Sequence, residues 1–204
     1  MVAEVEIDRP GQRMNDGACD AAGRFWAGTM CMQERPGLGS LYRLDPDGSS
    51  HRILTGVGIS NGIDWSLDGA TMYYVDSLTQ RIDRFDFDPA TGSVCNRRAF
   101  VTIDPAEGCP DGLTVDAEGG IWLALWGGSA IHRYRPDGTL ERVLRVPVTH
   151  PTTCAFGGPD LGDLYITSAT IRLSGEEKRR QPMAGGVMRH RPGVTGRPSH
   201  AFAG

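Results

Sequence analysis

One order of residues recurs four times along the chain and restricts its fold more than any other feature. Each copy has a short apolar strand, a turn containing glycine, and a second, mostly apolar strand with an aromatic residue three or four positions after that glycine. Apolar alternation bounded by Gly and Asp turns predicts paired strands. The turn glycines are Gly23, Gly69, Gly119 and Gly162, and the aromatic residues, which we expect in the core, are Trp26, Tyr73, Trp122 and Tyr165.

The position eight residues before each turn glycine is polar in three of the four copies. It is occupied by Asn15, Asn61, Asp111 and Cys154. These anchors repeat at a period of roughly 40 to 50 residues, and a period of that length with four strands per unit is typical of a β-propeller blade. We expect blade-like repeats at about residues 11–55, 56–104, 105–148 and 149–204, the last with a missing or very short fourth strand.

The chain as a whole is predicted to be one all-β domain over residues 1–204. It would hold about four blades plus one strand, and the domain would be incomplete at its N-terminus. The extra strand is expected at residues 2–7, where apolar and acidic residues alternate, and it would be available to complete a blade. Residues 11–15 are predicted to form a turn, and residues 170–184 a surface loop with one helical turn.

Charge and composition exclude several classes of partner. With 21 basic and 25 acidic residues and no basic stripe, the chain has no footprint for nucleic acid. No apolar run approaches the roughly 18 residues of a membrane helix, and acidic Glu4, Glu6 and Asp8 stand where a signal peptide would be basic. We therefore expect a cytoplasmic protein without membrane contact. The five cysteines include no C-x-x-C pair, which favours reduced thiols.

Four stretches carry a resemblance to a known family. They are NDGACD and GRFWAGTM at residues 15–20 and 23–30, ISNGIDWS at 59–66, PDG at 110–112 and TTCAFGG at 152–158. In this order and spacing the chain resembles the SMP-30/gluconolactonase family of regucalcin-like proteins, as a relative shortened at the N-terminus. The resemblance implies a six-bladed β-propeller with a divalent metal ion on its central axis and hydrolysis of sugar lactones.

Site residues follow from the same resemblance. It implies that Asn61 and Asp111 ligate the metal, with Asp111 also acting as general base, and that Arg13 and Asn15 hold the substrate. The metal would be Ca²⁺, Zn²⁺, Mn²⁺ or Mg²⁺. The first metal-ligating Glu of the family has no counterpart here, and a substrate-contacting Glu falls near Gln33 and Glu34, to which we assign no role.

The residues themselves leave two interpretations of these anchors open. Blade starts converge at one mouth of a propeller, so Asn15, Asn61 and Asp111 would face one another, and oxygen ligands suit a hard cation. Alternatively, Asn and Asp before Gly are ordinary turn residues that hydrogen-bond to their own backbone.

The leading functional hypothesis is metal-dependent lactone hydrolysis by a lactonase, with a small sugar lactone as partner. The alternative is a non-catalytic propeller fragment that binds metal or a protein, and a third interpretation is an incomplete gene product whose remaining blades lie upstream. Open blade edges also predict self-association. Neither the preferred lactone nor the metal is defined by the sequence.

Overall fold

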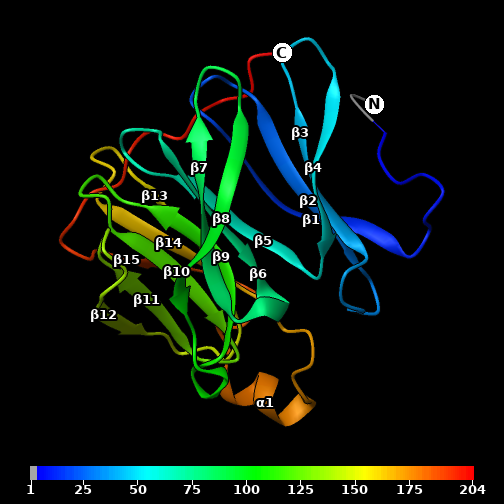
Figure 1. Ribbon diagram of the computed structural model, residues 1–204. Coiled ribbons are helices and arrows are strands. Elements are labelled where there is room, and N and C mark those ends of the chain that lie inside the picture. Colours follow the sequence, from blue (N-terminus) through cyan, green and yellow to red (C-terminus); the bar gives the residue numbers. More distant parts are fainter. Residues whose placement is uncertain (1–3) are drawn as a thin grey trace. The chain divides into compact units, whose positions relative to one another are not determined.

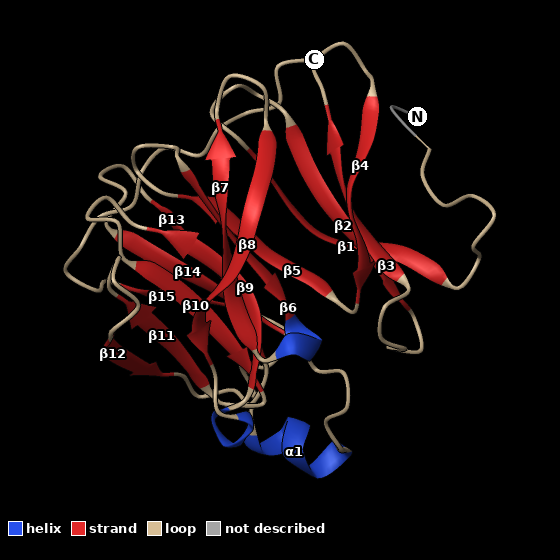
Figure 2. Ribbon diagram, viewed as in Figure 1, coloured by secondary structure: helices blue, strands red, loops and turns tan. Residues whose placement is uncertain are grey.

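The computed structural model describes residues 4–204 and consists mainly of antiparallel β-strands (Figures 1 and 2). Within these residues there is one short helix, α1 (Gly175–Arg180), and there are two 3₁₀ turns, at Ser77–Thr79 and Pro105–Glu107. No helix in the described part is long and apolar enough to cross a membrane. The strands form four sheets, each from consecutive segments of chain, which confirms the all-β propeller fold with about four blades.

The first two sheets belong to one compact unit, which comprises the chain up to Phe100 together with Ser199–Gly204. The first sheet has the strands β1 (Gln12–Cys19), β2 (Phe25–Cys31), β3 (Gly39–Leu44) and β4 (Ser50–Val57). The second has β5 (Ser60–Trp65), β6 (Thr71–Asp76), β7 (Arg81–Asp88) and β8 (Ser93–Thr102), whose last two residues pass into the other unit. Both sheets are in chain order.

The last two sheets belong to the second unit, Val101–Pro198. The third sheet has the strands β9 (Cys109–Val115), β10 (Ile121–Trp126), β11 (Ala130–Tyr134) and β12 (Leu140–Arg145). The fourth has three strands, β13 (Pro151–Gly157), β14 (Asp163–Ser168) and β15 (Val187–His190). A fourth strand is absent from this sheet among the described residues, as the sequence predicted. The loop expected between β14 and β15 contains α1, which begins with a capping box from Ser174.

Tight turns between the first and second strands have a common local cause. In the first and third sheets the turn starts at a buried aspartate, Asp20 or Asp116, and the glycine three residues later donates its N–H to the aspartate carbonyl. Gly23 and Gly119 have φ of 76° and 81°, which favours glycine because it has no Cβ. The recurring glycine is therefore a backbone requirement at Gly23, Gly69 and Gly119, whereas Gly162 does not have a positive φ.

Each unit has one apolar core between its two sheets. In the first unit Trp26 and Leu41 pack on Ile63, Trp65 and the neighbouring apolar side chains of the second sheet. In the second unit Trp122 packs on Cys154, Leu164 and Ile166. Tyr73 is also buried. Tyr165, which we expected in the core, is 36% exposed, because its side of β14 faces away from that cluster.

Two expectations for the N-terminal region are wrong. Residues 4–7 form no strand, and Val2 and Ala3 lie outside the described residues. The cause is local: Glu6 has φ of 53°, its carbonyl accepts the Arg9 N–H in a turn, and its Oε1 accepts a hydrogen bond from Tyr42 Oη at 3.1 Å. The predicted turn at 11–15 is instead the start of β1, where Gln12 pairs with Cys31.

Buried ion pairs join the Asp turns to the core. The Oδ2 atom of Asp116 accepts hydrogen bonds from Trp122 Nε1 at 2.8 Å and Arg133 Nε at 2.7 Å, while Oδ1 accepts from the Gly120 N–H. In the first sheet, Asp20 Oδ2 likewise accepts hydrogen bonds from Arg24 Nε and Trp26 Nε1. Both aspartates are therefore structural residues that tie a turn to the core.

We expect Asp116→Ala to lower the free energy of unfolding by about 3–5 kcal/mol, because it leaves the Arg133 charge buried without its main partner. Asp116→Asn should cost less, since the amide oxygen still accepts one of these hydrogen bonds. Urea unfolding followed by tryptophan fluorescence measures both. Asp137→Ala, in an exposed turn where Oδ1 accepts the Thr139 N–H, is the control and should cost about 1 kcal/mol or less. If Asp116→Ala and Asp137→Ala lower the free energy of unfolding equally, Asp116 does not have the structural role described.

Stability should also depend on pH through His132 on β11. This side chain is buried with Nδ1 2.9 Å from Tyr134 Oη, and burial holds its pKa below the ordinary value; Arg145 acts in the same direction and Glu107 against it. The unfolded chain takes up a proton at about pH 6.5, whereas the folded chain resists it. Stability is therefore lost as the pH falls through that value, by at most about 1.4 kcal/mol per pH unit.

His132→Gln should flatten this dependence. The measurement is the free energy of unfolding of the parent and the variant at several pH values between about 7 and 5. His51→Gln, at an exposed position on β4, serves as the control and should keep the parental slope. If His132→Gln and the parent have the same slope, His132 does not contribute to the acid sensitivity.

Candidate functional site

The first strand of every sheet carries a one-residue β-bulge at the same place. The register shifts between Met14 and Gly17 in β1, between Ser60 and Ile63 in β5, and between Pro110 and Leu113 in β9. Asn15, Asn61 and Asp111 are therefore bulge residues within strands, and the turn interpretation of them is wrong. Bulges re-aim side chains and occur often beside functional sites.

The register also corrects the fourth anchor. In β13 the shift falls between Pro151 and Thr153, so Thr152 corresponds to Asn15, Asn61 and Asp111, while Cys154 corresponds to Gly17. Counting eight residues back from Gly162 stops two residues short of Thr152, because the β13–β14 hairpin is one residue pair longer than the β1–β2 hairpin. Thr152 Oγ1 lies 2.6 Å from Thr167 Oγ1, and Cys154 is a buried packing residue.

In the first unit the bulges bring two of the predicted site residues into contact. Asn15 Nδ2 donates hydrogen bonds to Asn61 Oδ1 and to the Ser60 carbonyl, each at 2.8 Å, across 46 and 45 residues of sequence. Asn61 Nδ2 donates to Ser77 Oγ at 2.7 Å. Asn61 is only 8% exposed, so these contacts hold its amide in one orientation. We refer to Asn15, Asn61 and Ser77 as the amide chain.

The amide chain determines what Asn61 offers to a ligand. Its nitrogen donates to Ser77 Oγ, and its oxygen accepts a hydrogen bond from Asn15 Nδ2. An amide oxygen has two lone pairs, so one remains suited to a cation. Metal ligands in proteins are commonly held in place by residues that do not touch the metal. These residues hydrogen-bond to the polar atom of the ligand that does not bind the metal.

Arg13 and Asp16 flank Asn15 on β1 and differ in environment. Arg13 is exposed, and its Nη1 donates to the neighbouring Met14 carbonyl at 2.9 Å, so it does not join the amide chain. Asp16 is half-buried and accepts the Gly17 N–H at 2.7 Å; burial raises the pKa of its carboxyl, and the Gly17 hydrogen bond opposes this.

Sequence reasoning missed Asp16. It is the second bulge residue of β1, and the corresponding positions in the other sheets are Gly62, Gly112 and Thr153. Asp16 is the one carboxylate among these four equivalent positions, and this is the signal that could have identified it. The equivalence becomes visible only when the strands are aligned by their bulges.

Asp111 lies in the second unit, at the end of the third sheet where β9 begins. It is half-buried and follows Pro110, which pairs with Leu125 of β10. A Cβ at Gly112 would overlap the side chain of Thr153, so glycine there allows β9 to approach β13 closely. At the same strand ends the rings of Trp126 and His150 stack, with centroids 4.3 Å apart and an interplanar angle of 11°.

The predicted residues thus fall into two groups. Asn15 and Asn61 are in contact, Arg13 is on the strand of Asn15 without joining them, and Asp111 belongs to the second unit. Near Gln33, which accepts a hydrogen bond from Cys31 Sγ, Glu34 lies in a turn after β2. No three His, Cys, Asp or Glu side chains of residues 4–204 converge as metal ligands. The donors present are amide and carboxylate oxygens, which fit a hard divalent cation.

Together, sheets of consecutive antiparallel strands with a bulge in each first strand define a β-propeller, and the bulge positions Asn15, Asn61, Asp111 and Thr152 all carry oxygen-bearing side chains. The family model for the SMP-30/gluconolactonase/LRE-like region matches residues 1–170, and the chain belongs to this family. Regucalcin of Xenopus laevis is 42% identical over 210 residues, which cover 100% of this chain and 70% of that protein. Human regucalcin is 39% identical over 211 residues and is covered to 71%.

Solved structures agree with this assignment. The calcium-binding protein regucalcin of Agrobacterium tumefaciens is similar with a TM-score of 0.94 and 35% identity, over 99% of this chain and 68% of that one. A luciferin-regenerating enzyme gives a TM-score of 0.90 at 34% identity, over 98% and 68% of the two chains. A gluconolactonase of Xanthomonas campestris gives 0.65 at 26% identity, over 78% and 56%.

Proposed function

We propose that this chain hydrolyses a sugar lactone with the aid of one divalent metal ion, held by Asn61 and Asp111. The observation that supports the proposal is the amide chain, in which hydrogen bonds with Asn15 and Ser77 hold the Asn61 amide in one orientation. Membership of the SMP-30/gluconolactonase family supports the substrate class, because a solved relative is a gluconolactonase.

The reaction needs an electrophilic carbonyl and an activated water at neutral pH. A bound divalent ion would polarise the lactone carbonyl and make the attacking water more acidic. In the proposal Asp111 accepts a proton from that water while the water oxygen attacks the carbonyl carbon. The acyl C–O bond of the ring then breaks, and the same proton passes to the departing ring oxygen, which gives the open hydroxy acid.

Arg13 and Asn15 would hold the substrate. The exposed guanidinium of Arg13 has a planar set of donors that matches hydroxyl and carboxyl oxygens of a sugar acid. The nitrogen of Asn15 is engaged by Asn61 and Ser60, so its carbonyl oxygen is the atom offered to a substrate hydroxyl.

The direct test is hydrolysis of aldonolactones by the purified 204-residue chain, followed by acid release, with Ca²⁺, Zn²⁺, Mn²⁺ or Mg²⁺ added in turn. We expect turnover above the spontaneous rate with at least one of these ions and none after chelation. Turnover at the background rate with every ion would reject catalysis for this chain.

One observation favours a second candidate, a metal-binding protein without lactonase activity. The similar regucalcin of Agrobacterium tumefaciens is described as a calcium-binding protein. Stoichiometric metal binding measured by calorimetry, without lactone turnover, would support this candidate over the first.

A further inference from the structure

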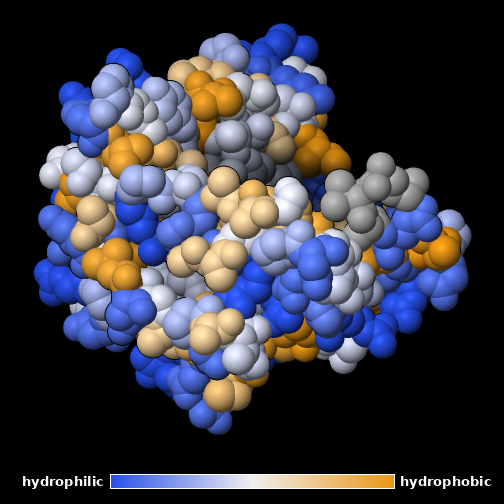
Figure 3. Space-filling model, turned by 90° about the horizontal axis from the view of Figure 1, so that it is seen from above, coloured by the Kyte–Doolittle hydropathy of each residue, from blue (hydrophilic) through white to orange (hydrophobic). Residues whose placement is uncertain are grey.

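Asp76, the last residue of β6, carries a carboxylate that is buried in the first unit. Hydrophilic residues cover much of the surface in Figure 3, where a charge stays hydrated, whereas Asp76 is only 4% exposed and needs protein partners in place of water. Backbone groups supply them: Oδ2 accepts the Gly58 N–H at 2.9 Å and Oδ1 accepts the Ile59 N–H at 3.0 Å. The strand register gives three residues equivalent to Asp76, none of them acidic: Thr29, Leu125 and Ser168. Among these four positions, a carboxylate occurs only in the sheet that carries Asn61.

The direction of the Asp76 side chain departs from the usual local pattern. Asp76 immediately precedes the 3₁₀ turn Ser77–Thr79, and an aspartate at such a position normally accepts an N–H of the turn that follows it. Its side chain makes no such capping hydrogen bond and reaches instead to the two residues before β5. A Cβ at Gly58 would lie 2.9 Å from Asp76 Oδ1, closer than real Cβ contacts, so glycine at this position allows the carboxylate to approach. The carboxylate therefore joins two segments that are separate in sequence.

Further hydrogen bonds extend from these two segments to Asn61. The Ser77 N–H donates to the Ile59 carbonyl at 3.0 Å, and Thr79 Oγ1 donates to the Asp76 carbonyl at 2.7 Å. Both backbone groups of Ile59 are thus bound to Asp76 or Ser77, two residues before Asn61. The Oγ atom of Ser77 in turn accepts the hydrogen bond from Asn61 Nδ2. Asp76 therefore contacts the chain that leads into Asn61 and precedes the turn that holds its side chain.

We propose that Asp76 is a positioning residue of the amide chain. Its carboxylate holds the Gly58–Ile59 segment against the start of the 3₁₀ turn, and through Ser77 it keeps the amide of Asn61 in one orientation. Asp76 itself touches neither metal nor substrate in this role. The effect on metal binding rests on the proposed function, whereas the effect on the orientation of Asn61 does not.

The test measures how fast the Nδ2 protons of Asn61 exchange with water. The sequence contains three asparagines, so ¹⁵N-asparagine labelling gives three side-chain amide signals in an NMR spectrum, and the signal that Asn61→Ala lacks belongs to Asn61. Asp76→Asn keeps the size of the side chain, but its single acceptor oxygen cannot serve both backbone N–H groups. We expect the Asn61 protons to exchange at least about tenfold faster in this variant. Asn96, whose Nδ2 donates to Asp86 on the exposed side of the second sheet, should keep its parental rate in the same spectrum.

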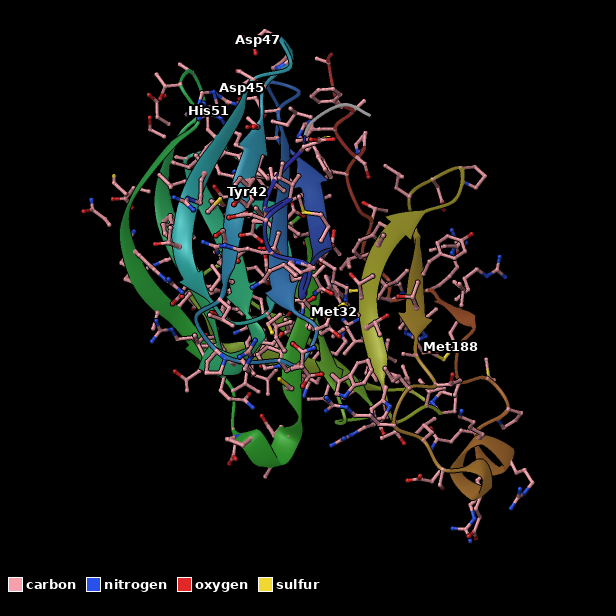
Figure 4. The ribbon with its side chains drawn as sticks, turned by 90° about the vertical axis from the view of Figure 1, so that its right-hand side faces the viewer. Met32, Tyr42, Asp45, Asp47, His51 and Met188 are labelled. Carbon is pink, nitrogen blue, oxygen red and sulfur yellow. The ribbon has the colours of Figure 1, made fainter. Side chains whose placement is uncertain are left out.

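Asp47→Asn is the matched control. It makes the same chemical change in an exposed turn, where Oδ1 accepts the Ser49 N–H at 2.9 Å, and Figure 4 labels Asp47 and Met32 at opposite ends of the first sheet. The Asn61 protons should exchange in this variant as they do in the parent. The double variant of Asp76→Asn and Ser77→Ala should exchange no faster than Ser77→Ala alone, because Asp76 acts through Ser77.

Parental exchange of Asn61 in Asp76→Asn overturns the proposal, and so does a double variant in which the two effects multiply. Circular dichroism melting checks that the variants fold. If Asp76→Asn does not fold, Thr79→Val takes its place: it frees the 3₁₀ turn from the Asp76 carbonyl and should also speed the exchange of Asn61, whereas a parental rate would reject the proposal.

Metal titration separates this proposal from the proposed function. Asp76→Asn should raise the Kd for Ca²⁺ or Mn²⁺ by about tenfold, the usual effect of removing a residue that supports a metal ligand. If Asn61→Ala leaves this Kd unchanged, the proposed metal site is wrong, and the exchange rate of Asn61 still decides the role of Asp76. If Asn61→Ala raises the Kd and Asp76→Asn does not, Asp76 has no positioning role in the metal site.

Discussion

Asp111→Asn is expected to lower kcat for aldonolactone hydrolysis by about 10²–10⁴-fold, the usual contribution of a general base. Asparagine preserves the size of the side chain at the bulge of β9 but cannot accept the proton of the attacking water. In the proposed site it also replaces a charged metal ligand by a neutral one, so metal affinity should fall in the same variant. The measurement is kcat with the activating metal at saturation, together with a metal titration.

The matched control is Asp137→Asn, which makes the same chemical change in an exposed turn of the same unit. It should leave both kcat and metal affinity unchanged. Thermal melting separates the proposed role from a structural one, because we expect both variants to melt close to the parent. If Asp111→Asn retains turnover within a few-fold of the parent, another group activates the water.

Asn61→Ala is expected to raise the Kd for the divalent ion by at least about 100-fold, since it removes the amide oxygen that the amide chain holds in place. Ser77→Ala leaves that oxygen but removes the acceptor that fixes the amide nitrogen, so a smaller loss of about 10-fold should follow. Isothermal titration of Ca²⁺ or Mn²⁺ into the three proteins gives this ranking without a requirement for catalysis.

Asn96→Gly controls for the loss of an amide side chain. Asn96 is exposed on β8, where its Nδ2 donates to Asp86, and its φ of 52° suits glycine. Its metal affinity should equal that of the parent. A Ser77→Ala loss as large as that of Asn61→Ala would mean that the region loses its structure rather than one ligand, and unchanged affinity in both would place the metal elsewhere.

Much of the architecture follows from local sequence. The strands β6 and β10 fall where the aromatic repeat predicted them, because alternation and a glycine with positive φ act over fewer than ten residues. The fourth sheet was expected to have a missing or very short fourth strand, and it has three strands among the described residues. Where a single residue overrides the pattern, prediction fails: the left-handed conformation of Glu6 and its contact with Tyr42 replace the strand expected there.

The anchors show where counting along the sequence reaches its limit. Spacing identified Asn15, Asn61 and Asp111 as equivalent, which the three bulges confirm, yet it chose Cys154 where the register has Thr152. A hairpin that is one residue pair longer adds two residues between the anchor and the turn glycine, and it leaves the alternation of side chains unchanged. The periodicity of the sequence cannot detect the two added residues, whereas the pairing of the strands shows them.

The sequence by itself determined the class of fold, the family and the identity of the candidate ligands, since these depend on turn residues, alternation and repeat length. Only the tertiary structure decided how the amide of Asn61 is oriented. The orientation of Asn61 depends on Ser77, 16 residues later, and on Asn15, 46 residues earlier. Hydrogen bonds between residues so far apart form only when two bulged strands pack side by side, and no local pattern encodes which lone pair of an amide they leave for a metal.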